Sequence, residues 1–224
     1  MQPFRFTLLS AGPHDLPTIL RGPETGPCVL FVPPLFEEMN RTRRLLADLG
    51  RALAAEGIAS VLPDLPGTGD APGTPGIAVW RDAVAHLIAQ TRRPLHVLAV
   101  RGGALLTDGS GSRGLYRVAP AASGAGLLRE MTRAQAIADQ ERDGARVAPS
   151  AYEGRFARGE TVALTGYDIP APLAADLAAL ILPEAAVPLR VSEVEGPPVW
   201  RQAEPAPAPA FANALAEDIA RWLR

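Results

Sequence analysis

The sequence contains no lysine and a single cysteine. All 22 basic residues are arginine, so catalysis by a lysine amine is excluded. Cys28 has no second cysteine to pair with, which excludes disulfides within the chain and metal sites built from several thiolates. The lack of disulfides favours a reducing, cytoplasmic location. No apolar run is long enough to span a bilayer, and the first twelve residues lack the apolar core of a signal peptide.

The chain also lacks a large excess of positive or negative charge. The formal net charge is -2, which argues against a broad surface for nucleic acid or anionic membranes. Of the 224 residues, 47% are hydrophobic and 21% are charged, the balance of a globular protein with a full core. We therefore expect residues 1–224 to form a single domain.

Short apolar runs alternate with longer segments of helical periodicity, a pattern typical of an α/β domain. The strongest strand signals are the apolar runs at 28–32 and 95–100, and the clearest helix is 37–56, which Gly57 ends. The full set of predicted strands is 4–9, 17–20, 28–32, 58–62, 95–100, 114–118, 161–164 and 187–193. The full set of predicted helices is 37–56, 80–91, a helix from about Ala104, 127–142, 172–182 and 211–223.

A strand, a glycine turn and a helix around residue 101 form the frame of a nucleophile elbow. In that motif Gly-x-Ser-x-Gly places a serine at the tip of a strained turn, and small residues let the strand and helix pass closely. The corresponding residues here run from Ala99 to Gly103, with Arg101 at the centre. A guanidinium stays protonated and is no nucleophile.

The catalytic histidine of such an elbow is also missing from its expected place. The sequence has three histidines, which are His14, His86 and His96. None lies in the proline-rich loop 197–209 after the last predicted strand, where the base belongs. The standard Ser-His-Asp triad is therefore absent.

Several motifs resemble the exosortase A system-associated hydrolases, found near bacterial exopolysaccharide and protein-sorting genes. The resemblance covers most of the chain and is strongest to the second type of that group, whose elbow also lacks the serine. It is carried by VPPLFEEMNR at 32–41, LPDLPGTGD at 62–70, VRGGALL at 100–106, and the segments 120–133, 166–167 and 196–200. It implies an α/β-hydrolase fold, which we expect as a mostly parallel sheet with helices on both faces and little or no separate cap. One departure is Pro-Pro-Leu-Phe at 33–36, where an oxyanion motif of His-Gly type would stand.

In this fold the loops that follow the parallel strands meet at the carboxyl edge of the sheet. The candidate ligand-binding residues there are Phe36, Glu37, Glu38, Asn40, Arg101, Gly102 and Trp200. With helix N–H groups below it, Arg101 would form a receptor for a carboxylate or phosphate. The favoured alternative is a structural ion pair, in which Glu37 or Glu38 neutralises Arg101. Arg41, Arg43 and Arg44 are expected on a solvated helix face.

Three residues are candidates for residual catalysis. Glu38 or Asp64 could activate a water, and Ser123 could be a displaced nucleophile. Plainer roles compete with these, because Asp64 and Asp70 flank a turn and serine is common in turns. No cluster has metal-ligand spacing and no glycine loop has the phosphate-binding pattern, so no metal or cofactor is expected.

Three functions follow. The first is a non-catalytic binding or accessory protein of an exopolysaccharide or exosortase-linked system, with a protein partner from the same gene system. The second is a non-standard ester or thioester hydrolase using a carboxylate-activated water. The third is a module that binds a small anionic or acyl ligand, with Arg101 on its acid head.

Overall fold

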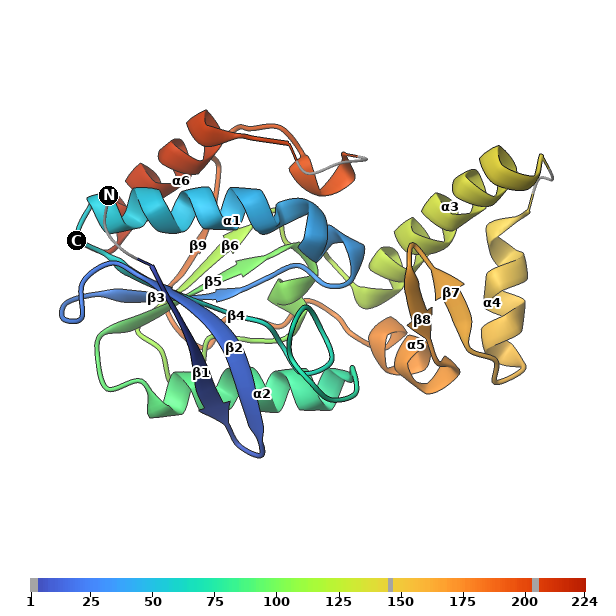
Figure 1. Ribbon diagram of the computed structural model, residues 1–224, viewed down its shortest axis with the longest axis horizontal. Coiled ribbons are helices and arrows are strands. Elements are labelled where there is room, and N and C mark those ends of the chain that lie inside the picture. The colour runs from blue at the N-terminus through green and yellow to red at the C-terminus, as the bar shows by residue number, and fades with distance from the viewer. Residues whose placement is uncertain (1–3, 145–146, 203–205) are drawn as a thin grey trace. The chain divides into compact units, whose positions relative to one another are not determined.

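The computed structural model describes residues 4–144, 147–202 and 206–224 (Figure 1). The chain divides into two compact units by its internal contacts. The first, called the sheet unit, comprises Met1–Pro120 and Pro183–Arg224. The second, called the insert unit, is Ala121–Leu182. Each is described by itself.

A seven-stranded sheet is the centre of the sheet unit. Its order is β1-β2-β4-β3-β5-β6-β9, in which β3, β4, β5, β6 and β9 are parallel and the β1–β2 hairpin is antiparallel. The bounds are β1 Arg5–Ala11, β2 His14–Arg21, β3 Cys28–Val32, β4 Ala59–Pro63, β5 Leu95–Val100, β6 Leu115–Val118 and β9 Leu189–Val191. Every residue of β3 is buried, which explains its uninterrupted apolar sequence. The mostly parallel sheet that the sequence predicts is confirmed.

Helices cover both faces of this sheet, as expected (Figure 1). Helices α1 (Glu37–Ala55) and α6 (Pro209–Trp222) lie together on one face, and α2 (Ile77–Gln90) lies on the other. The predicted stripe of α1 is buried against the sheet and α6; it consists of Leu45, Leu46, Leu49 and Leu53. On the second face Trp80 of α2 is fully buried, and its indole N–H donates to the Pro66 carbonyl over 2.8 Å.

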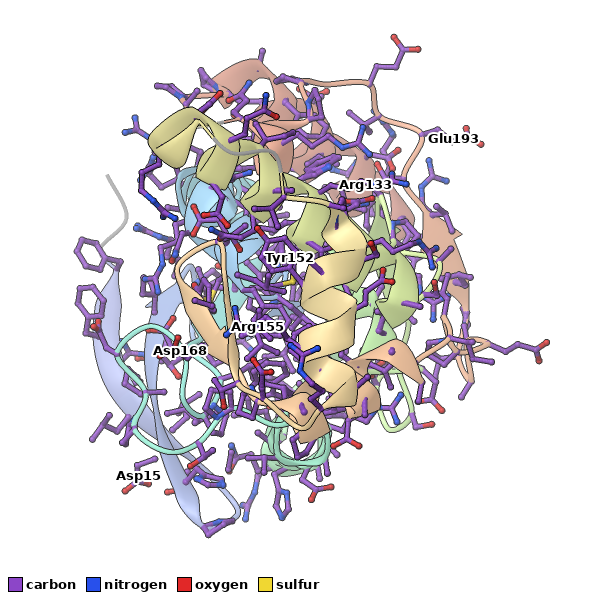
Figure 2. The ribbon with its side chains drawn as sticks, turned by 90° about the vertical axis from the view of Figure 1, so that its right-hand side faces the viewer. Asp15, Arg133, Tyr152, Arg155, Asp168 and Glu193 are labelled. Carbon is purple, nitrogen blue, oxygen red and sulfur yellow. The ribbon has the colours of Figure 1, made fainter. Side chains whose placement is uncertain are left out.

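The insert unit holds α3 (Gly124–Asp143), α4 (Pro149–Ala157), α5 (Ala171–Ala178) and the hairpin of β7 (Val162–Leu164) with β8 (Tyr167–Ile169). Tyr152 of α4 donates its hydroxyl to Asp139 of α3. Figure 2 labels Tyr152 and Arg155 on α4 and Asp168 on β8.

The sequence led us to expect little separate structure beside the main sheet, whereas these 62 residues cluster as a compact unit. Strands of three residues give too short an alternation to reveal β8 in the sequence. Whether residues 1–224 fold as one domain stays a prediction.

The helix predicted from Ala104 is wrong. A five-residue 3-10 helix, Arg101–Leu105, is followed by a loop instead. Side chains of that loop bind its own backbone, since Thr107 accepts from the Gly109 N–H over 3.0 Å and Asp108 from the Ser110 N–H over 2.9 Å. Such local bonds compete with helix formation. Helix α4 and strand β8 were not predicted, and the boundaries of the other predicted elements differ by a few residues.

A buried carboxylate ties α6 to the sheet. Asp218 accepts from the Tyr116 hydroxyl at 2.5 Å and from two nitrogens of Arg190, Nε at 2.8 Å and Nη2 at 2.7 Å. The Arg190 guanidinium is the main cause that lowers the pKa of Asp218 to about 2. Burial is the main cause that raises the pKa of Tyr116 to about 12. At neutral pH the carboxylate is therefore ionised and the phenol protonated, the states that this geometry requires.

Replacing Asp218 with asparagine is expected to lower the free energy of unfolding by about 2 kcal/mol, because the amide loses the ionic bond to Arg190. The same bond predicts a pH dependence. The folded pKa lies below the unfolded value of about 3.9, so the stabilisation is present above pH 4 and is lost as pH falls toward 2. Urea unfolding between pH 7 and pH 2.5 measures both effects. Glu217→Gln, an exposed neighbour on α6, is the matched control and should change little.

Candidate functional site

Three residues with strained backbone conformations lie at the carboxyl edge of the sheet. Phe36, Arg101 and Ala119 follow β3, β5 and β6, and their φ angles are 55°, 50° and 43°. Residues with a Cβ rarely adopt this left-handed region, because the Cβ crowds the neighbouring backbone. Such strain persists only where the surrounding structure enforces it, and it concentrates at functional sites. This edge of the sheet is the candidate site.

The turn at Arg101 has the geometry of an elbow. The chain leaves β5 at Val100, reverses at Arg101 and passes directly over the end of β3. A Cβ on Gly103 would lie 2.3 Å from the Pro33 carbonyl oxygen and 2.4 Å from that of Val32. Only glycine fits at this crossing, so the small residue predicted at the end of the elbow has a steric reason.

Arg101 forms an ion pair with Glu38 at the start of α1. Its Nε lies 3.0 Å from Glu38 Oε1 and 3.3 Å from Oε2, and its Nη2 lies 2.9 Å from Oε1. The two side chains are 10% and 12% exposed, so the pair is largely removed from water. The guanidinium also contacts a backbone carbonyl and an aromatic ring. The Ala119 carbonyl accepts from Nη1 over 3.4 Å, and the ring of Trp200 lies 5.5 Å from the guanidinium carbon.

Glu37 has different partners from Glu38. It accepts from Asn40 Nδ2 at 3.2 Å and from Arg41 Nε at 3.4 Å, while Arg41 Nη1 also donates to the Trp200 carbonyl over 3.4 Å. Arg41 therefore belongs to the site and is not on a solvated face as expected. The spacing of four residues between Glu37 and Arg41 is the sequence signal that was available for this contact.

The structure thus joins most of the predicted ligand-binding residues in one chain of contacts. The hydrogen bonds and the ring contact described above link five of them, which are Glu37, Glu38, Asn40, Arg101 and Trp200. Two others are part of the surrounding frame. Phe36 is buried and packs its ring edge-on against Trp80 at a centroid distance of 5.6 Å, and Gly102 is buried in the 3-10 helix. Sequence reasoning missed the Ala119 carbonyl, which no side-chain pattern reveals.

Asp64 has contacts typical of a turn carboxylate. Its Oδ2 accepts from the Asp70 backbone N–H over 2.9 Å, and its Oδ1 lies 3.4 Å from Arg43 Nη2. Gly69, inside the loop that this bond closes, has a φ of 54°, and a Cβ there would lie 2.3 Å from Asp64 Oδ2. The carboxylate therefore fixes the loop after β4.

Ser123 caps a helix. Its hydroxyl accepts from the Gly126 N–H over 3.1 Å at the first turn of α3, in the insert unit. This is the ordinary role of a serine that precedes a helix.

The three histidines lie on other elements. His14 begins β2, and His86 in α2 bonds the Asp82 carbonyl at 2.8 Å through Nδ1. His96 lies near the start of β5, at the opposite end of that strand from Arg101, and packs edge-on against Trp222. Burial, with a smaller effect of Arg113, lowers the pKa of His96. Within the loop 197–209 the positions 203–205 lie outside the described residues; their sequence is Ala-Glu-Pro.

Within residues 4–144, 147–202 and 206–224, no three His, Cys, Asp or Glu side chains gather closely enough to hold a metal ion. No helix in those ranges combines the length and apolarity needed to cross a bilayer.

Comparison with solved structures identifies the fold. The ferulic-acid-bound esterase Est1E from Butyrivibrio proteoclasticus is similar with a TM-score of 0.57 and 14% identity, over 83% of this chain and 77% of that one. The α/β hydrolase GrgF from a Penicillium species gives 0.57 and 14%, over 80% and 74%. The mouse α/β-hydrolase domain-containing protein 10 gives 0.55 and 17%, over 84% and 76%. Neither a protein-family model nor a curated protein matches the sequence. The chain therefore has an α/β-hydrolase fold.

A double-mutant cycle on Arg101→Ala and Glu38→Ala tests the strength of the ion pair. Each single variant should lose about 2–3 kcal/mol of unfolding free energy, because the remaining, largely buried charge loses the hydrogen bonds of this ion pair. The double variant should lose clearly less than the sum, with a coupling of about 2 kcal/mol in urea unfolding. Alanine also carries a Cβ, so the backbone strain at position 101 is similar in both proteins. It therefore contributes little to the difference in unfolding free energy between wild type and Arg101→Ala.

The pair of Arg224 and Glu56, 3.7 Å apart with side chains 76% and 41% exposed, is the control and should couple by no more than about 0.5 kcal/mol. Additive losses at Arg101 and Glu38 would show that the two side chains do not stabilise each other.

Proposed function

We propose that this α/β-hydrolase-fold chain is non-catalytic and acts as a binding or accessory protein of a bacterial exopolysaccharide or exosortase-linked system. The observation that carries the proposal is the ion pair of Arg101 with Glu38 at the tip of the elbow. The link to the exosortase system rests on the sequence resemblance, and it predicts neighbouring genes of that system.

Nucleophilic catalysis needs a group that releases its proton and a base that accepts it. The guanidinium at position 101 keeps its proton at any physiological pH. The three histidines lie on β2, α2 and β5 rather than in loop 197–209. The nucleophile and the base of the standard mechanism are therefore both missing from their standard positions, the elbow tip and the loop 197–209.

The contacts of Arg101 also weigh against an anionic ligand on its guanidinium. Glu38 accepts from Nε and Nη2, so a carboxylate or phosphate would have to displace a carboxylate that is already desolvated and in place. The helix expected beneath Arg101 is a 3-10 helix of five residues, too short for a substantial dipole. A structural role for the pair is the better supported of the two alternatives.

Hydrolysis by a carboxylate-activated water is the competing function. Glu38 and Asp64 are the carboxylates it would use. Donors already occupy their oxygens, namely Arg101 on Glu38 and the Asp70 N–H with Arg43 on Asp64. A water would have to approach a base whose positions are largely taken, which favours the non-catalytic proposal.

The proposal predicts no turnover of p-nitrophenyl or acyl-CoA esters above the buffer rate and no labelling by a fluorophosphonate probe. Arg101→Ser should also stay unlabelled, because the restored hydroxyl would have no histidine to activate it. A known serine esterase, assayed alongside, shows that substrates and probe are active.

Two outcomes would overturn the proposal. Turnover that disappears in Glu38→Gln or Asp64→Asn would establish carboxylate-assisted hydrolysis. Labelling that disappears in Ser123→Ala would establish a displaced nucleophile.

A further inference from the structure

The outer edge of the sheet carries large apolar side chains that the sheet unit leaves exposed. Phe4, Phe6 and Leu8 are 47%, 72% and 63% exposed. They alternate along the chain and therefore point to one face of the sheet. Among the described residues, β1 is the last strand on its side of the sheet and pairs with β2 alone, so one row of its backbone N–H and C=O groups has no partner strand there.

This edge lacks the usual devices that prevent strands from pairing. Natural edge strands carry charges, proline or bulges, because an open edge is a template for a further strand. Strand β1 has no proline, and its seven consecutive pairs with β2 contain no bulge. Its single charged residue, Arg5, alternates with Phe4 and Phe6 and belongs to the opposite face.

The apolar face continues inward from the edge. Phe6 lies beside Ile19 of β2, which lies beside Leu62 of β4. Between this row and α1 is a cavity of about 260 Å³, lined mainly by apolar residues, with Met39 and Leu46 on the α1 side. On this face helix α1 packs over the inner strands and reaches β2, but Phe4, Phe6 and Leu8 stay exposed, while α2 contacts β1.

We propose that β1 pairs antiparallel with β1 of a second copy of this chain, across a two-fold axis at Phe6. In this register Phe6 faces Phe6, and each Phe4 faces Leu8 of the other copy. The three exposed apolar side chains thus form one cross-strand ladder on a continuous sheet. When the two-fold axis passes between two copies of the same residue, that facing pair can be of the hydrogen-bonded or the non-hydrogen-bonded type. The proposed register is therefore possible whichever amides of β1 point outward.

The arrangement of β1 favours a second copy over another occupant. The apolar positions read the same in both directions from Phe6, as a two-fold interface requires. Charges agree with this pairing, because Arg5 lies opposite Thr7 and no like charges face each other. A small molecule in the 260 Å³ cavity would leave Leu8 and the free backbone groups of β1 uncovered.

Sedimentation velocity on the full chain tests the proposal. The wild type should be a dimer at micromolar concentration. Phe6→Glu and Phe6→Lys should each raise the dimer dissociation constant about 100-fold or more, because two like charges meet at the axis. An equimolar mixture of the two variants should recover the dimer, since residue 6 of one copy faces residue 6 of the other. Far-UV circular dichroism should be unchanged, because Phe6 is mostly exposed within one copy.

The control is Leu189→Glu on β9, the strand at the other end of the sheet, where Leu189 is 44% exposed. It should leave the dimer intact. A monomeric wild type, a dimer that survives Phe6→Glu, a dimer abolished only by Leu189→Glu, or a mixture that stays monomeric would each overturn the proposed interface.

A disulfide trap gives a second readout. The only native cysteine, Cys28, is buried, so the background of intermolecular disulfides is low. Phe6→Cys should form a covalent dimer under mild oxidation, because facing residues of paired strands approach within disulfide reach. Leu189→Cys should not. Equal cross-linking of both variants would show random collision and contradict the proposal.

Discussion

The close crossing of the elbow over the end of β3 is the constraint on which the site depends. The carbonyls of Val32 and Pro33 leave no room for a side chain at position 103, so the turn after β5 must be glycine-rich and tight. A turn this tight holds Arg101 in a left-handed conformation directly after the strand. The backbone thus fixes where residue 101 stands, and the chemistry of the edge follows from which side chain is placed there.

A guanidinium at that point needs a carboxylate, because it is largely removed from water. Glu38 meets this need from the first turn of α1, where its negative charge also suits the helix dipole. The same turn lacks a side-chain cap, since Phe36 precedes the helix with its ring buried against Trp80. One carboxylate therefore helps to stabilise both the helix start and the elbow, which argues for treating them as one structural unit.

Much of this was readable in the sequence. The apolar runs of β3 and β5, the leucine stripe of α1 and the Arg-Gly-Gly turn predict the central strands and the position of Arg101. The choice of Glu38 over Glu37 was not predictable, because adjacent residues on a helix point about 100° apart and the sequence does not fix the helix rotation. A longer helix was expected instead of the 3-10 helix Arg101–Leu105, because the hydrogen bonds of Thr107 and Asp108 to the backbone of the following loop are not visible in the apolar pattern. The hairpin β7–β8 was missed in part because three-residue strands carry almost no periodicity.

The exposed face of β1 shows a different limit of sequence reasoning. Alternation of Phe4, Phe6 and Leu8 with Arg5 and Thr7 predicts a strand at 4–9, but it does not show whether the apolar face of that strand is covered. Only the placement of α1 over the inner strands shows that this face stays open. The charged groups at the elbow are hydrogen-bonded to each other, whereas the apolar side chains at the sheet edge remain exposed to water. Exposed apolar surface favours association, so the contrast between the two places is the physical basis for the proposed pairing of two copies through β1.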